Sequence, residues 1–222
     1  MTAWTDTRAA GAALPGDEPQ GTAQVLAGRD RRLGAGLLVG GALGLLAAFV
    51  LAVEKFRLLT EADYVPTCSI NPVLSCGSVM SSPQAEVFGF PNPLLGLIGF
   101  TAVLVVGAAL TGGAALPSWF WAGLQLGVVA GVIFVHWLIE ASLYRIGALC
   151  PYCVVVWVVV IALFTAVTAR NLTAVAHRLP PAIQPVVAAL HRRQTIVVTV
   201  WLLGIAALIT VRFWTFWSTT LG

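Results

Sequence analysis

The chain alternates between long apolar stretches and short polar ones. Five stretches, at residues 33–53, 93–110, 118–143, 148–168 and 195–216, are almost wholly apolar. Each is close to the roughly twenty residues that a helix needs to cross the hydrocarbon core of a bilayer. The pattern therefore predicts an all-α integral membrane protein with five transmembrane helices.

Composition agrees with this prediction. Of the 222 residues, 59% are hydrophobic and 9% are charged, whereas soluble domains carry about 25% charged residues. So few charges cannot cover a water-facing surface, and we expect most of the chain to contact membrane lipid. The net charge is only +3, and the basic residues are spread over separate loops. The chain therefore lacks the basic face that nucleic-acid binding requires, which excludes that class of function.

The distribution of basic residues predicts an orientation. Loops with an excess of Lys and Arg stay in the cytoplasm. Eight basic residues fall on the side of the N-terminus and four on the other, namely Arg8, Arg29, Arg31, Arg32, Arg170, Arg178, Arg192 and Arg193 against Lys55, Arg57, Arg145 and Arg212. We expect a multi-pass protein of the cell (inner) membrane with a cytoplasmic N-terminus and an extracytoplasmic C-terminus.

The polar stretches give the expected boundaries. Residues 1–32 contain acidic residues and prolines without an apolar signal core, which favours a disordered cytoplasmic tail over a cleaved signal. Residues 54–91 form the longest loop, on the extracytoplasmic side. Residues 171–194 form a cytoplasmic loop, and residues 195–222 contain the fifth transmembrane helix.

All four cysteines fall on the extracytoplasmic side of this arrangement. Cys68 and Cys76 lie in the long loop, and Cys150 and Cys153 lie at the start of the fourth apolar stretch. The orientation used only Lys and Arg, so this agreement is independent of it. An oxidising compartment permits disulfides at these positions.

The Cys-Pro-Tyr-Cys sequence at residues 150–153 is typical of a redox site. Proline favours the first helical position, which makes Cys150 the expected N-cap and places both sulfurs at the positive end of a helix dipole. This location lowers the pKa of a thiol. A zinc site would need four ligands, but His136 lies within a helix, and His177 and His191 lie on the cytoplasmic side. Two purely structural disulfides are the other alternative, although no loop needs closing at residues 150–153.

Two dithiol pairs on one face of a membrane indicate a relay. Thiol–disulfide exchange would carry electrons from a soluble partner to the loop pair, and from the loop pair to the helix pair. The electrons would then leave to a lipid-soluble two-electron acceptor, of which a quinone is the natural example. The sequence has no nucleotide, haem or iron–sulfur motif that would supply another acceptor.

Four motifs resemble the vitamin K epoxide reductase family in their order and spacing. They are Cys68-Ser-Ile-Asn-Pro-Val-Leu-Ser-Cys76, Ser81-Ser82, Asn92-Pro93-Leu94-Leu95-Gly96 and Cys150-Pro-Tyr-Cys153. The resemblance covers roughly residues 33–170. It implies a catalytic core of four helices around a quinone, with the long loop folded over the pocket and the fifth helix outside the core.

The resemblance also implies roles for the cysteines. Cys150 and Cys153 match the redox pair that faces the quinone, with Cys153 in contact with it, and Cys68 and Cys76 match the loop pair. A partner thiolate would attack an exposed Cys68, and the freed Cys76 would then attack Cys150.

Two polar residues complete the implied site. Ser82 matches a residue that supports the active-site cysteines, and Asn92 matches one that donates a hydrogen bond to a quinone carbonyl. Each precedes a proline, so each could instead be an ordinary helix cap. Trp157 stands where the animal enzymes of the family have tyrosine, so vitamin K epoxide reduction is not expected.

These observations predict a quinone-dependent disulfide-forming oxidoreductase. It would reoxidise extracytoplasmic thioredoxin-like proteins and pass the electrons to menaquinone or ubiquinone. Many bacterial members of the family carry a fused thioredoxin-like domain, and the partner is expected here to be a separate protein. The alternative is a non-enzymatic membrane carrier that binds soft metals through its cysteines.

Overall fold

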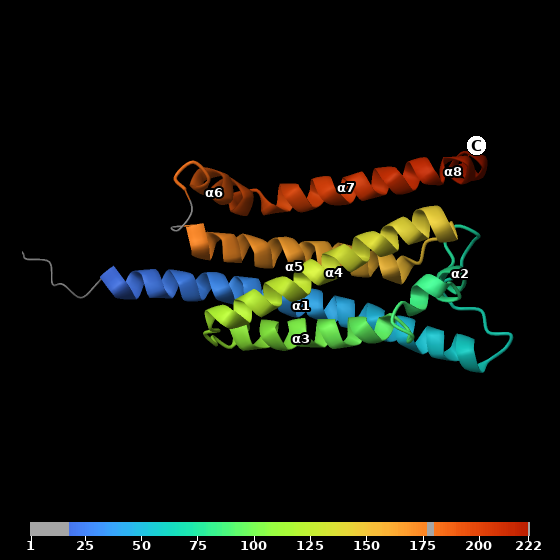
Figure 1. Ribbon diagram of the computed structural model, residues 1–222, viewed down its shortest axis with the longest axis horizontal. Helices are drawn as coiled ribbons and strands as arrows, with labels where there is room; N and C mark the ends of the chain where they lie inside the picture. The colour runs from blue at the N-terminus through green and yellow to red at the C-terminus, as the bar shows by residue number, and fades with distance from the viewer. Residues whose placement is uncertain (1–17, 177–179, 222) are drawn as a thin grey trace, which may run out of the picture.

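A computed structural model describes residues 18–176 and 180–221 (Figure 1). Its elements are α1 (Glu18–Thr60), α2 (Cys76–Met80), η1 (Pro83–Glu86), α3 (Pro93–Thr111), α4 (Ser118–Glu140), η2 (Ala141–Ile146), α5 (Pro151–Val175), α6 (Gln184–Arg192), α7 (Gln194–Arg212) and α8 (Trp214–Leu221). Five helices in this part of the chain are long and apolar enough to cross a membrane, and they contain the five predicted stretches almost entirely. The predicted all-α membrane fold is confirmed.

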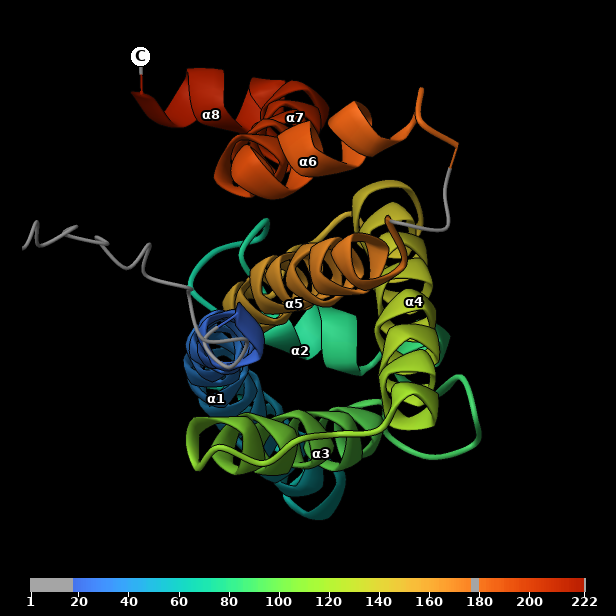
Figure 2. The same ribbon diagram turned by 90° about the vertical axis from the view of Figure 1, so that its left-hand side faces the viewer.

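The four helices α1, α3, α4 and α5 form a four-sided bundle, and α7 lies outside it beside α5 (Figure 2). Because successive long helices run in opposite directions, the polar segments that join them lie at the two ends of the bundle. The loop between α1 and α3, the turn before α5 and α8 share one end, called the loop end below (Figure 1). All four cysteines lie there.

Glycines allow α1 and α3 to pack closely. A Cβ atom added at Gly41 would lie 2.8 Å from the backbone nitrogen of Leu104, and one at Gly34 would lie 2.7 Å from Cβ of Leu110. One added at Gly107 would press on the backbone of α1. Close approach of backbones through small residues is how membrane helices gain packing energy when lipid removes the hydrophobic driving force.

Outside the bundle, α7 makes polar contacts with α4 and η2, and its Ile205 and Ile209 pack against the apolar cluster that contains Trp157. Trp201 Nε1 donates a hydrogen bond to His136 Nε2 over 3.0 Å, and Arg212 Nε donates to the carbonyl oxygen of Leu143 over 2.9 Å. Because His136 Nε2 accepts, Nδ1 carries the proton and donates to the carbonyl of Val132. None of the most apolar part of α7 is buried within the protein, so this helix presents most of its surface to lipid.

The structure differs from three expected boundaries. Residues 18–32 were expected to be disordered, but they form the beginning of α1. The segment after Pro19 has no further proline and contains several good helix formers, which lets the helix extend beyond its apolar part; residues 1–17 lie outside the described residues. The expected loop at residues 171–194 contains the end of α5 and the short helix α6. At its other end α1 continues to Thr60, so the long loop begins after the expected residue 54.

Candidate redox site at the loop end

Local turns shape the part of the loop that lies against the start of α5. The side chain of Asn71 accepts hydrogen bonds from the backbone nitrogens of Val73 and Leu74, which turns the chain after Ile70. Ser75 then caps α2, its hydroxyl accepting from the backbone nitrogen of Ser78. Cys76 is therefore the first residue of a helix that the Ser75 side chain caps.

A short parallel bridge joins this loop to the segment before α5. Leu74 pairs with Leu149: the Leu149 nitrogen donates to the carbonyl of Val73 over 2.7 Å, and the Ser75 nitrogen donates to the carbonyl of Leu149 over 2.9 Å. Gly147, with a φ of 70°, makes the turn that leads into this segment after η2. Cys150 directly follows Leu149, and Cys76 follows Leu74 by two positions, so the bridge brings the two cysteines close together.

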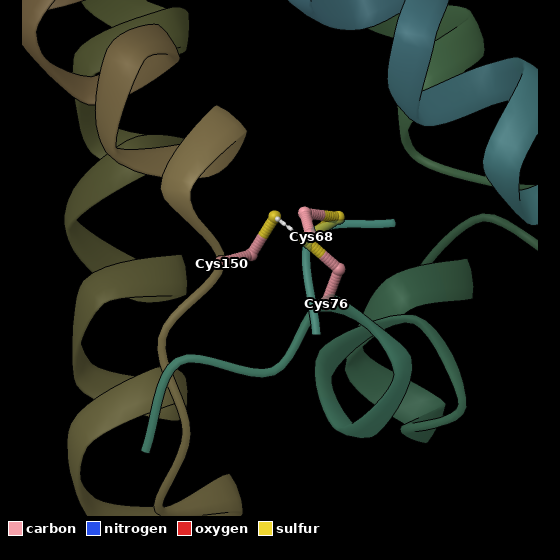
Figure 3. A group of neighbouring side chains, drawn as sticks. All are labelled: Cys68, Cys76 and Cys150. Carbon is pink, nitrogen blue, oxygen red and sulfur yellow. Dashed lines mark hydrogen bonds between the residues drawn. A yellow bond between two sulfur atoms is a disulfide. The ribbon is translucent and has the colours of Figure 1, made fainter. Parts of the chain in front are cut away.

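Three sulfur atoms meet at this point (Figure 3). Cys68 and Cys76 form a disulfide, and Cys150 Sγ lies 3.0 Å from Cys76 Sγ. Cys150 and Cys153 are free thiols. Because Cys76 has no proton in the disulfide, Cys150 either donates to it or, once deprotonated, is placed to attack it.

The expectation that Cys68 is exposed is wrong. Its exposed fraction is 6%, against 0% for Cys76 and 1% for Cys150. Leu51 and Met80 pack around the three sulfurs in one buried cluster. A partner thiol can therefore reach Cys68 only if the loop moves.

The environment of Cys150 favours its thiolate. Cys150 is the N-cap of α5, with Pro151 in the first turn, as the sequence predicts. A hydrogen bond with the Cys153 thiol lowers the pKa of Cys150 below its ordinary value, burial partly opposes this shift, and the backbone N–H groups of Cys153 and Tyr152 lower the pKa further. A larger thiolate fraction makes Cys150 a better nucleophile and a better leaving group in disulfide exchange.

Next to the sulfur cluster, an apolar cavity of about 760 Å³ lies within the four-helix bundle. Its walls come from all four helices, and the loop segment after α2 covers the loop end. Cys153 lines this cavity, whereas Cys150 does not. The Cys150–Cys153 pair therefore stands between the loop disulfide and the cavity. The few polar groups on the wall include Ser82, Gln84, Asn92 and Ser142.

The two predicted polar site residues line the cavity and also hold the loop. Ser82 donates to the carbonyl of Val79 over 2.7 Å and caps no helix with its side chain. Asn92 Nδ2 donates to the carbonyl of Gln84 over 2.7 Å, and its Oδ1 accepts from the backbone nitrogen of Val87 over 3.2 Å. Neither side chain makes the helix-capping hydrogen bond that was the alternative.

Two charged residues that the sequence reasoning missed anchor the loop to α1. Glu54 and Lys55 are 6% exposed. Glu54 accepts from Tyr64 Oη over 2.7 Å and from Thr67 Oγ1 over 2.6 Å, next to Cys68. Lys55 Nζ donates to the carbonyl of Met80 and pairs with Glu86, both over 2.8 Å. Adjacent residues of one helix thus hold the two sides of the loop, before and after the disulfide.

Replacing Lys55 with Met should loosen the cover of the cavity. The carbonyl of Met80 would lose a charged donor in a buried place, and we expect the free energy of unfolding to fall by about 1 to 3 kcal/mol. Thermal unfolding of the purified protein in detergent measures this loss. Lys55→Arg keeps the charge and should lose less, and Arg32→Met removes an exposed cation of the same helix that is far from the loop. Equal losses for Lys55→Met and Arg32→Met would show that the loop anchor contributes nothing.

Comparison with known proteins points to one family. No curated protein matches the chain. The sequence profile of the vitamin K epoxide reductase family matches residues 36–168, which is more than half of the chain and includes most of the bundle, the loop and all four cysteines. The chain therefore belongs to the vitamin K epoxide reductase family.

Proposed function

We propose that the protein is a quinone-dependent oxidoreductase that forms disulfides in extracytoplasmic thioredoxin-like proteins. Members of the family are generally oxidoreductases. The observation that carries the proposal is the 3.0 Å contact between Cys76 Sγ and Cys150 Sγ, with Cys153 on the wall of an apolar cavity. This contact makes one continuous path from the loop disulfide to the cavity.

The first half of the reaction transfers two electrons from the partner to the loop. A partner thiolate attacks Cys68, the Cys68–Cys76 bond breaks, and Cys76 leaves as a thiolate. The second partner thiol then attacks the mixed disulfide, so that the partner is oxidised and Cys68 is released. The loop now holds two thiols.

The second half passes these electrons to α5. Cys76 attacks Cys150 of a Cys150–Cys153 disulfide and releases Cys153. Cys68 then attacks Cys76, restores the loop disulfide and releases Cys150. The resulting state has an oxidised loop pair and a reduced helix pair, which is the pairing seen in the structure.

The cavity fits a quinone. Its volume lies within the range of small-molecule sites, and its apolar walls suit a substituted ring with a lipid tail. Trp157 lines it, and the buried Nε1 of Trp157 has no hydrogen-bond partner among the described residues. A bound quinone would accept two electrons and two protons and leave as the quinol. We assign Trp157 and Asn92 as donors toward it and Cys153 as the thiol that faces it.

A reconstituted reaction tests the proposal. The purified full-length protein is mixed with a reduced thioredoxin-like protein and a short-chain quinone, and quinone absorbance is followed. We expect the quinone to be reduced as the partner is oxidised, with one quinol formed for each partner disulfide. Absence of quinone reduction, with a partner that still exchanges with the loop, would overturn the assignment.

Changing Trp157 to Phe tests the fit of the cavity. Loss of one hydrogen bond of about 1 to 1.5 kcal/mol should raise the KM for quinone roughly tenfold and change kcat less. Trp121→Phe is a matched control, because Trp121 Nε1 is also buried without a hydrogen-bond partner in the described part of the chain but Trp121 does not line the cavity. Asn92→Ala measures the other donor in the same assay. Equal KM values for both tryptophan variants would contradict the role of Trp157.

The loop end is assigned to the extracytoplasmic side, on the basis of the basic residues and the disulfide. Two exposed positions at opposite ends of the bundle test this orientation, Ile70 in the loop and Ala115 between α3 and α4. In intact cells, a membrane-impermeant maleimide should label Ile70→Cys and should label Ala115→Cys only after lysis. The reverse pattern would place the partner in the cytoplasm.

A further inference from the structure

The relay brings three soft ligands to one point. The sulfur atoms of Cys68, Cys76 and Cys150 all lie within 4.8 Å of one another, and all three residues are buried. Cys153, the fourth cysteine, is not in this group and instead lines the cavity. Exchange between two disulfide pairs requires such a cluster, because the attacked sulfur must contact both its old and its new partner.

The surroundings of the cluster are also soft. Met80 is buried in the same hydrophobic cluster as the loop disulfide and the Cys150 thiol, so a residue with a thioether group packs against the site. The nearby carboxylate of Glu54 is engaged by the hydroxyls of Thr67 and Tyr64, and the ammonium group of Lys55 is engaged by the carbonyl of Met80 and by Glu86. The nearby charged groups therefore already have partners, and the ligand atoms that the site offers are the three cysteine sulfurs.

We propose that the reduced loop creates a binding site for Cu(I). A dithiol reductant converts the Cys68–Cys76 disulfide into two thiols and is itself oxidised to a disulfide. Cys68, Cys76 and Cys150 then bind one Cu(I) in a trigonal arrangement, with Met80 as a further soft neighbour. Binding releases the thiol protons, and copper stays in the +1 state throughout.

The donor set selects among metals. Thiolate and thioether ligands favour Cu(I), whereas a structural zinc site is completed by four ligands, commonly thiolates and imidazoles. The three histidines of the chain, His136, His177 and His191, are remote from the loop in the sequence, and the described one, His136, is paired with Trp201. Three buried thiols, with Met80 packed in the same cluster, are therefore a better match for Cu(I) than for zinc.

Copper bound in this place would stop the relay. It would occupy Cys76 and Cys150, the two sulfurs whose exchange links the loop to α5. The loop disulfide blocks the site in the oxidised state, so the site exists only while the loop is reduced. The inference requires only that the loop disulfide can be reduced, and it does not depend on electron transfer to a quinone.

A binding titration tests the site without any turnover. The full-length protein in detergent is reduced with a phosphine, desalted without oxygen and titrated against the coloured Cu(I)–bicinchoninate complex. We expect the reduced protein to remove one Cu(I) per chain from the chelator and the disulfide form to remove none. X-ray absorption of the copper-loaded protein should show only sulfur ligands. Equal binding by the disulfide form, or nitrogen and oxygen ligands, would overturn the site.

Serine variants identify the ligands. Cys68→Ser, Cys76→Ser and Cys150→Ser should each lose competition with the chelator, while Cys153→Ser should keep it. Thermal unfolding of each variant in the same detergent separates loss of a ligand from loss of the fold. If Cys153→Ser loses binding as fully as Cys150→Ser while both stay folded, the metal is held by the α5 pair and the three-cysteine site is wrong.

Discussion

A Cys153→Ala variant is expected to lose turnover and to accumulate a disulfide between Cys76 and Cys150. Cys150 Sγ already lies 3.0 Å from Cys76 Sγ, so its thiolate needs little movement to attack. The attack breaks the Cys68–Cys76 bond and releases Cys68 as a thiolate. Without Cys153 no thiol on α5 can resolve the mixed disulfide, and only Cys68 can reverse it.

Alkylation makes this result measurable. N-ethylmaleimide added under native conditions should trap the released Cys68 and block the reverse reaction. Mass spectrometry of the digest should then find a peptide pair joined through Cys76 and Cys150, with the alkyl group on Cys68. A dominant bond between Cys68 and Cys150 would reverse the roles of the two loop cysteines. Free Cys150 with an intact loop disulfide would mean that the two pairs do not exchange.

The second large effect is expected from Gly107→Ala. A Cβ atom at this position would press on the backbone nitrogen of Leu38, and backbone cannot move aside as a flexible side chain can. Overpacking of this kind costs about 1 to 3 kcal/mol, and more where the neighbour is rigid. Thermal unfolding in detergent should show a clear drop in Tm, because α1 and α3 would have to separate along their length.

Gly99 provides the matched control for this substitution. It lies on the same helix, eight residues earlier, and a Cβ atom there would meet no atom within 4 Å. Gly99→Ala should therefore keep the Tm or raise it slightly, since alanine favours the helix over glycine. An equal loss in both variants would attribute the effect to glycine itself and not to the contact between α1 and α3.

Much of the fold could be predicted because lipid imposes simple rules. Backbone groups in a membrane must bond within a helix, so apolar length alone located the five spans. Proline at position 151 likewise placed Cys150 at the start of α5, because the local backbone decides that position. These features depend on residues that are neighbours along the chain, so they can be predicted from the sequence alone.

The rest of the site depends on contacts between distant residues. The bridge from Leu74 to Leu149 joins two segments that have no strand pattern of their own, so only the folded chain reveals it. The sequence predicts the beginning of a loop at Glu54 and Lys55, because charges commonly mark the end of a membrane span. In the structure Glu54 accepts hydrogen bonds from Tyr64 and Thr67, and Lys55 pairs with Glu86. The helix α1 continues past both residues to Thr60.

The order of the cysteines along the chain affects how the loop disulfide forms during biosynthesis. Cys68 and Cys76 are separated by 8 positions, whereas Cys76 and Cys150 are separated by 74. Chains emerge from the ribosome N-terminal end first, so both loop cysteines are made before α4 and α5 exist. During that interval the loop pair has no Cys150 beside it and can only react with itself or with other proteins. The newly made protein is thus expected to acquire its loop disulfide from an outside oxidant, including copies that were completed earlier.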